Sequence, residues 1–186
     1  METLIWIASL VIVVFIHEFG HYAAARLWRV RVKEVQVFFF PIIKYTPDVT
    51  PSTPLNSWRR TRWVLGLLPF GGVTLFDPYQ YGALQPFKRL VISLAGIAFN
   101  IATWIVIMLL DVTVGVSPFI YYVGIVSGYL ALLNVIPVYP LDGGAALLEL
   151  YEMITGRQPS AQFRQVLAGI GTVLIILFFW IIPLLG

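Results

Sequence analysis

An apolar run near the start of the chain contains the segment HEFGH, residues 17–21, and this combination constrains the fold more than any other feature. The run covers residues 4–25, which is long enough to cross a bilayer as a helix. Two imidazoles and a carboxylate inside such a helix are costly unless they are paired or bind a metal. Other parts of the protein must therefore cover this segment, and ionisable groups at such a depth are functional by default.

The spacing within HEFGH is that of a metal site on a helix. A helix advances about 100° per residue, so His17 and His21 share one face and both imidazoles can reach one ion. Glu18 lies about 100° round from His17, where it can reach a water molecule at the ion rather than the ion itself. This is the H-E-x-x-H pattern of zinc hydrolases, and it predicts a Zn²⁺ cofactor with Glu18 as the catalytic carboxylate. In soluble chains so short a pattern is most often accidental, but the apolar setting favours metal binding here.

The composition is that of an integral membrane protein. Of the 186 residues, 59% are hydrophobic and 11% are charged, whereas a soluble domain carries about 25% charged residues. The length favours one membrane domain, residues 1–186, without a sizeable appendage, and no cleavable signal peptide is expected. The lack of cysteine excludes a thiolate zinc site. The net charge of +3 does not indicate a nucleic-acid partner, because the charges are distributed by membrane side.

The hydropathy pattern predicts a mainly α-helical fold with about four transmembrane helices and a membrane-associated β region. A further short helix is expected at residues 145–154. The expected transmembrane spans are residues 4–28, 87–110, 119–136 and 166–185.

The β region is expected between the first two spans, at about residues 30–73. Residues 30–45 and 63–70 are rich in valine, leucine and aromatic residues, which favours a hairpin or small sheet with a bulge near Glu34. The second strand is expected to stop at Pro69 and Gly71-Gly72. Two strands are marginal alone, so an edge should stay available to a third strand, with Val64 and Leu67 as candidate edge positions.

The basic residues predict the orientation. All 12 Lys and Arg residues fall after the first span, before the second, or between the third and fourth. The positive-inside rule makes this side cytoplasmic, so four spans leave both termini outside. His17 then lies about 20 Å along its helix from the outer end, in the cytoplasmic third of a core about 30 Å thick. We therefore expect a multi-pass protein in the lipid bilayer, with its basic loops and active site toward the cytoplasm.

A catalytic zinc site needs a third protein ligand, and without cysteine or a third histidine this ligand must be a carboxylate. Asp142 is the strongest candidate, because residues 134–143, NVIPVYPLDG, form a proline-broken stretch at membrane depth. Irregular backbone there is tolerated only where it lines a cavity or the protein interior. The alternative is that Asp142 caps the helix that begins near Ala145. The residues alone support both interpretations equally.

The two motifs together resemble the site-2 protease family of intramembrane zinc metalloproteases. HEFGH matches the first core span, and the complete N-x-x-P-x-x-x-L-D-G pattern runs from Asn134 to Gly143. The segment PFGG at residues 69–72 resembles the P-x-G-G element that follows the family's β region. Residues 88–100 resemble the second-span G-P-x-x-N motif, except that isoleucine replaces the usual proline at position 97.

The resemblance covers roughly residues 15–144 and implies a minimal member of the family. The link between the second and third spans, residues 111–118, is too short for the PDZ domain that many members carry there, and no room remains for a CBS domain. The topology common in the family agrees with the one predicted from charge.

The resemblance implies an endopeptidase that cleaves transmembrane segments of membrane-protein substrates in regulated intramembrane proteolysis. Asn134 and Asn100 would hydrogen-bond the unwound substrate. Each could instead make an ordinary interhelical hydrogen bond; we favour this for Asn100, and substrate binding for Asn134. The zinc ligands implied by the resemblance are His17, His21 and Asp142.

Two other functions fit parts of the sequence. A membrane H-E-x-x-H peptidase of the type that trims prenylated proteins would take its third ligand from a downstream glutamate, here Glu149 or Glu152. Both glutamates lie beyond the proline break, on the expected cytoplasmic surface. A non-catalytic metal-binding membrane protein would not need Glu18 between its ligands. The LDGG segment at residues 141–144 argues against both alternatives.

Overall fold

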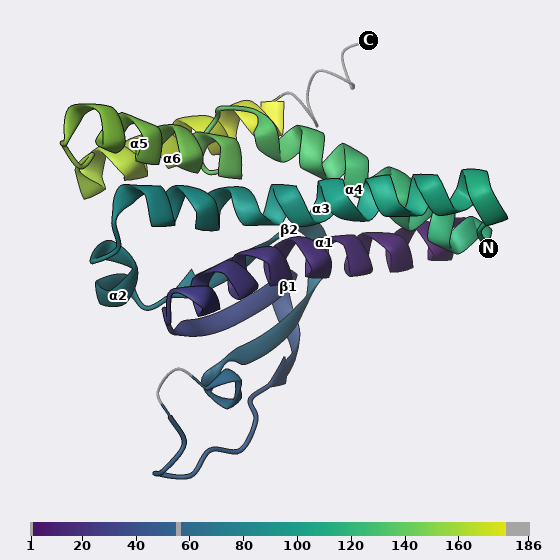
Figure 1. Cartoon of the computed structure of the whole chain (residues 1–186), viewed down its shortest axis with the longest axis horizontal. Helices are drawn as coiled ribbons and strands as arrows, with labels where there is room; N and C mark the ends of the chain where they lie inside the picture. Colours follow the sequence, from purple (N-terminus) through teal and green to yellow (C-terminus); the bar gives the residue numbers. More distant parts are fainter. Residues whose placement is uncertain (1, 55–56, 178–186) are drawn as a thin grey trace.

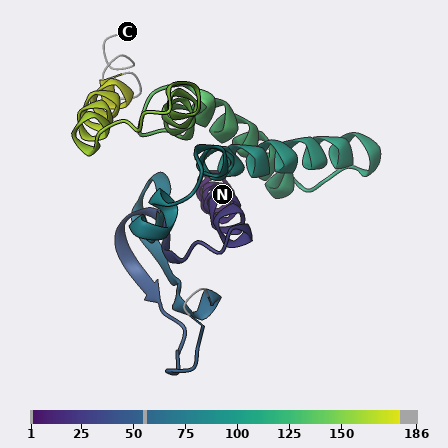
Figure 2. The same cartoon turned by 60° about the vertical axis from the view of Figure 1, so that its left-hand side comes forward.

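The computed structural model describes residues 2–54 and 57–177. Figure 1 shows α1 and α3 side by side, with α5 and α6 beyond α3 and the two strands on the other side of α1. Figure 2 shows the same order from a second direction. In chain order the elements are α1 (Glu2–Leu27), β1 (Val32–Tyr45), the 3₁₀ turn η1 (Trp58–Arg60), β2 (Arg62–Phe76), α2 (Pro78–Gly82), α3 (Pro86–Val114), α4 (Pro118–Val135), α5 (Asp142–Thr155) and α6 (Ala161–Ile176).

Three of the described helices, α1, α3 and α4, are long and apolar enough to cross a membrane. They correspond to the first three predicted spans, so the prediction of a mainly helical membrane protein is confirmed. The fourth predicted span, residues 166–185, lies partly outside the described residues, and α6 covers its first part. The short helix expected at residues 145–154 is α5, which begins three residues earlier, at Asp142 itself.

Proline sets the start of two of these helices. Pro86 and Pro118 occupy the first turn of α3 and α4, where a missing N–H costs no helical hydrogen bond. The hydroxyl of Ser117 accepts a hydrogen bond from the Ile120 N–H, and Gly115 ends α3 with a φ of 70°. The connection between the two helices is therefore a tight reversal, as its length predicts.

The two strands form an antiparallel sheet in which both strands bend, so that some residues have neighbours on both sides. Val35 pairs with both Thr74 and Trp63, and Trp63 also pairs with Tyr45. The order across the sheet is therefore residues 72–76, 34–37, 62–65 and 43–45. The two outer segments are the edges.

The bends occur where the backbone adopts positive φ angles. In β1 these residues are Phe38 and Phe40, with φ of 67° and 58°, and in β2 it is Gly71, with φ of 75°. Glycine adopts this conformation without a steric penalty, so β2 turns at Gly71 and resumes pairing with the first part of β1. The predicted irregularity near Glu34 is also present, because the register shifts between Val32 and Glu34.

Two predictions about the β region are wrong. β2 does not stop at Pro69 and Gly71-Gly72 but continues to Phe76, because the bend at Gly71 redirects the strand without ending it. Val64 is not an edge residue: it pairs with Gln36 on one side and Lys44 on the other, and its side chain is buried.

Candidate metal centre

The candidate site lies on the face of α1 that packs against α3. His17 and His21 are one turn apart, and both are buried. Asp142, at the start of α5, places Oδ2 3.0 Å from His17 Nε2 and 3.1 Å from His21 Nε2. The two Nε2 atoms are 3.3 Å apart. The structure thus brings the three predicted ligands together, although they are separated by up to 125 positions in the chain.

The chemistry of these three groups fits a metal ion. His21 Nδ1 donates to the Ile92 carbonyl at 2.7 Å, which leaves a lone pair on its Nε2. Among the described residues, Asp142 Oδ2 has no hydrogen-bond donor, although it is buried between the two rings. Three donors placed tetrahedrally at about 2.0–2.1 Å from a zinc ion would lie about 3.3 Å from one another, close to the distances in this triangle. Three protein ligands are the number that catalytic zinc sites use, and they would leave one position of a bound zinc for water.

Asn100 gives a second indication of a metal. It is fully buried on α3 with Nδ2 3.4 Å from His17 Nδ1, while its Oδ1 has no hydrogen-bond partner among the described residues. Turning the amide by 180° exchanges the two atoms, and Oδ1 then accepts a hydrogen bond from the Nδ1–H of His17. This arrangement gives Oδ1 a hydrogen-bond donor and leaves the His17 Nε2 lone pair free for an ion.

Two glycines allow the helices to meet at the histidines. Gly96 of α3 lies against both imidazoles, and a Cβ atom there would overlap with ring atoms of His17 and His21. A Cβ atom on Gly20 of α1 would lie 2.6 Å from the Ala95 carbonyl oxygen. A larger residue at either position would push α3 away from α1 and open the site.

Glu18 faces the sheet, whereas His17 and His21 face α3. Its Oε2 accepts a hydrogen bond from the Thr74 hydroxyl at 2.7 Å, and its side chain is buried. A Cβ atom on Gly72 would lie 2.6 Å from the Gln36 carbonyl oxygen and 2.7 Å from Glu18 Oε1, so only glycine fits there. Gly72 and Thr74 are two residues apart on β2 and therefore face the same side of the sheet.

The role of Thr74 was not predicted from the sequence. The predicted second strand ended before it, so nothing placed its hydroxyl near Glu18. The alternation of side chains in a strand could have indicated this role. If the strand continues through Gly72, Thr74 lies on the same face as that glycine.

The two asparagines differ in position. Asn100 lies against His17, as described above. Asn134, at the end of α4, donates its side-chain amide to the Leu130 carbonyl of its own helix at 2.9 Å. Substrate binding by either residue stays a prediction.

The two glutamates considered as alternative ligands have other partners. Glu149 accepts a hydrogen bond from Arg89 Nε at 2.7 Å, and Glu152 also pairs with Arg89. Arg164 lies 3.4 Å from the other oxygen of Glu149. This geometry gives no support to a ligand set of the prenyl-protein-trimming type.

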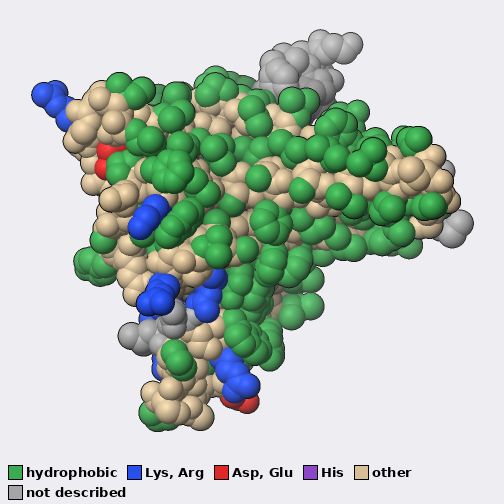
Figure 3. All heavy atoms as spheres, viewed as in Figure 1, with side chains coloured by type: hydrophobic (Ala, Val, Ile, Leu, Met, Phe, Trp, Pro, Cys, Tyr) green, Lys and Arg blue, Asp and Glu red, His purple; other side chains and the backbone are tan. Residues whose placement is uncertain are grey.

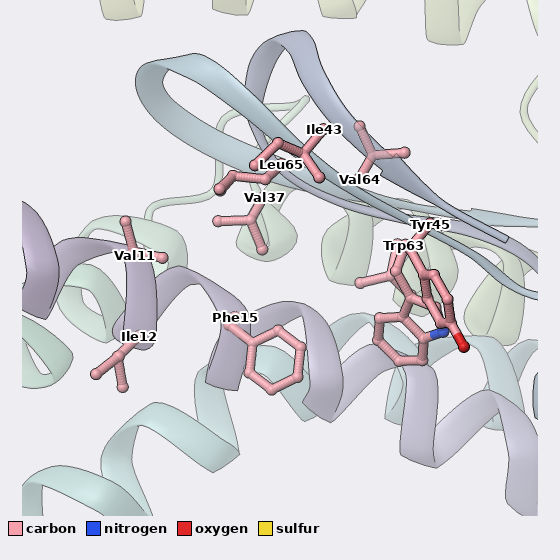
Figure 4. A pocket seen from close by; sticks show the side chains of 10 residues that line it. Val11, Ile12, Phe15, Val37, Ile43, Tyr45, Trp63, Val64 and Leu65 are labelled. Carbon is pink, nitrogen blue, oxygen red and sulfur yellow. The ribbon is translucent and has the colours of Figure 1, made fainter. Parts of the chain in front are cut away.

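An apolar groove of about 320 Å³ lies between α1 and the sheet (Figure 4). Ile12 and Phe15, which line it from α1, lie about 140° and 160° round the helix from His17. The groove is therefore on the opposite flank of α1 and is separate from the candidate metal centre. The remaining lining residues are Val11, Val35, Val37, Ile43, Tyr45, Trp63, Val64 and Leu65.

Comparison with known proteins gives one family. The sequence pattern of the family described as Peptidase family M50 matches residues 5–116 and 111–178. A Neisseria meningitidis protein named "Putative zinc metalloprotease" is 33% identical over 142 residues, which are 68% of this chain and 29% of that protein. A Staphylococcus aureus protein with the same descriptive name is 27% identical over 150 residues, covering 72% of this chain and 35% of that protein. The chain thus spans about a third of the length of these relatives.

A solved structure shares the fold. The site-2 protease from Methanocaldococcus jannaschii superposes with a TM-score of 0.59 at 21% sequence identity. The match covers 97% of this chain and 68% of that one.

Proposed function

Because the chain belongs to peptidase family M50, we propose that it is a zinc-dependent intramembrane endopeptidase that cleaves transmembrane segments of membrane-protein substrates in regulated intramembrane proteolysis. One observation carries this proposal. His17, His21 and Asp142 converge next to Glu18, in a bundle whose helices can cross a membrane. A hydrolytic site on a membrane-spanning helix suits a substrate that is itself in the bilayer.

In this proposal each residue has a defined task. Zinc, when held by the three ligands, supplies a Lewis acid that activates water and polarises the scissile carbonyl. Glu18 takes a proton from the attacking water and passes it to the leaving amine. The Thr74 hydroxyl holds Glu18 Oε2 at 2.7 Å, which leaves Oε1 available for that proton. Asn100 keeps the His17 ring in the orientation that presents Nε2.

We also propose that the protein is one multi-pass membrane domain with its basic loops and active site toward the cytoplasm and both termini outside. Figure 3 supports this: Lys and Arg side chains gather toward the end where the hairpin lies, and hydrophobic side chains cover most of the remaining face. The N-terminus lies at the opposite end of α1 (Figure 1). Lys and Arg favour the cytoplasmic side, and the hydrophobic surface would contact lipid.

Metal removal tests the proposed function. We expect the purified protein in lipid vesicles to cleave a single-span reporter, to lose this activity on zinc chelation, and to regain it with Zn²⁺. Mg²⁺ should not restore activity, because two imidazoles favour zinc over a hard oxygen-seeking cation. The measurement is the amount of cleaved reporter beside the zinc content of the same sample. Full cleavage by protein shown to be metal-free would contradict the proposal.

A helical substrate must unwind before cleavage, which frees backbone groups that need new partners in the membrane. Addition of the unwound segment to a sheet edge would supply them. Of the two edges, residues 72–76 adjoin Glu18, through Gly72 and Thr74, whereas residues 43–45 lie three segments away. We therefore propose that the substrate pairs with residues 72–76.

Proline substitution along this edge tests strand addition. Successive N–H groups point to opposite sides of a strand, so substitutions at Val73, Leu75 and Phe76 sample both directions. We expect at least one folded, zinc-loaded variant to cleave about tenfold more slowly, since it lacks one hydrogen-bond donor to the substrate. Proline at Lys44, on the far edge, is the matched control and should cleave normally. Wild-type rates in all folded edge variants would rule out pairing at residues 72–76.

A further inference from the structure

A buried ion cluster lies between α3 and α5, apart from the residues that perform the proposed chemistry. Arg89 of α3 is 2% exposed; its Nε donates to Glu149 at 2.7 Å and its Nη2 donates to Glu152, both on α5. Arg164 of α6 pairs with the second oxygen of Glu149, which is 1% exposed. Arg89 and Glu149 are thus a buried pair flanked by one partly buried charge of each sign, and loss of either buried partner would leave a buried charge uncompensated.

The guanidinium of Arg89 is fixed on every side. Its Nη1 donates to the carbonyl oxygens of Gly82 and Leu84, at 3.2 Å and 2.7 Å. All three nitrogens of the group therefore have acceptors, from the end of α2 to α5. Lysine carries the same charge but cannot make this set of directed bonds.

On both α3 and α5, the residue of the ion cluster is seven positions from the residue at the candidate metal centre. Arg89 precedes Gly96 by seven residues on α3, and Glu149 follows Asp142 by seven residues on α5. Seven residues are about two helical turns, or about 10.5 Å, and return to nearly the same helix face. Gly96 packs against the imidazoles that Asp142 contacts, and Arg89 binds Glu149. α3 therefore contacts the histidines of α1 at the level of Asp142, and it contacts α5 again two turns away, at Glu149.

We propose that Arg89 is a positioning residue that sets the register of α5 against α3, so that Asp142 meets the two histidines. Ion pairs have discrete partners, whereas apolar helix faces tolerate small slides. A slide of α5 by one residue is about 1.5 Å, several times the roughly 0.2 Å that metal-ligand distances tolerate. The inference rests on the metal site of the proposed function.

A second element could hold Asp142 from the other side. The segment 136–141 contains two prolines, and Gly143 packs against the backbone carbonyls of Val135 and Ile136. If this packing alone fixes Asp142, the ion cluster serves only the stability of the fold. Metal binding separates the two possibilities, because a stabilising role changes the folded fraction but not the ligand geometry within it.

Cobalt is the probe for this experiment, because the visible absorption of bound Co²⁺ depends on the number and geometry of its ligands. We expect Arg89→Met to bind Zn²⁺ and Co²⁺ about 10- to 100-fold more weakly than wild type, as for other residues that orient metal ligands. The visible spectrum of its bound Co²⁺ should differ from that of wild type, because the ligand geometry changes. Arg89→Lys should restore only part of the affinity. Arg62→Met is the control: it breaks the exposed Arg62–Glu34 pair and should leave affinity and spectrum unchanged.

The outcomes are distinct. Wild-type affinity and spectrum in the folded fraction of Arg89→Met would overturn the inference and assign the placement of Asp142 to segment 136–141. If Arg89→Met does not fold, Arg89→Lys decides the question, because it keeps the charge but cannot make the same set of directed hydrogen bonds. Wild-type Co²⁺ affinity and spectrum in Arg89→Lys would likewise overturn the inference. Failure of the wild-type protein to bind either metal would instead overturn the proposed function.

Discussion

Replacement of Glu18 by glutamine is expected to reduce cleavage about 10³-fold while zinc content stays unchanged. Glutamine has nearly the same volume, and its carbonyl oxygen can still accept the hydrogen bond from Thr74, but it cannot take up a proton. Glu18 makes its hydrogen bond to β2 and is not one of the three grouped metal ligands, so the metal site should persist. The measurements are the cleavage rate of a single-span substrate and the zinc content per chain.

Glu34→Gln is the matched control for this variant. It changes the same functional group in an ion pair whose Arg62 partner is half exposed. Glu34 pairs with Leu75 across the sheet, whereas Thr74, the partner of Glu18, pairs with Val35. Its cleavage rate should equal that of wild type. A wild-type rate in zinc-loaded Glu18→Gln would remove Glu18 from the chemistry and favour a metal-binding protein without this catalytic mechanism.

Asp142→Ala is expected to lose most of the bound zinc, from about one ion per chain, and all measurable cleavage. The substitution leaves two imidazoles, which cannot close a three-ligand site, and it removes the acidic oxygen that lies 3.0 Å and 3.1 Å from them. Zinc per chain measured on the purified, folded variant checks this result. Retention of full zinc by Asp142→Ala would show that the third ligand is elsewhere and would revive the glutamates of α5 as candidates.

The sequence was informative where the signal is local. The two histidines of HEFGH face the same way because both lie on one helix, so their pairing follows from spacing alone. The spans were readable for the same reason, since each is a continuous apolar run. Asp142 needed more, because the residues supported a helix cap equally well, and only the likeness of the NVIPVYPLDG stretch to a family motif favoured a ligand.

The sequence was uninformative where tertiary packing decides. The segment PFGG, with a proline and two glycines, is a normal end for a strand, but in β2 the glycine at position 71 makes a bend, and pairing with β1 resumes after it. That error hid the partner of Glu18. Similarly, the sequence alone indicates only that Arg89 is one of the basic residues that mark the cytoplasmic side. Its burial between Glu149 and Glu152 depends on how α3 and α5 pack, which no local pattern records.

The candidate metal centre combines residues near the start of the chain with one made much later, and this has a consequence during synthesis. His17, Glu18 and His21 enter the membrane with the first helix, whereas Asp142 is made 121 residues after His21. At about 5–20 residues per second, this delay is roughly 6–24 s. Through that interval α3 and the sheet can already cover the polar face of α1, but the proposed third ligand does not yet exist. In the proposed function, a nascent chain therefore cannot assemble its metal site until the chain has been made as far as α5.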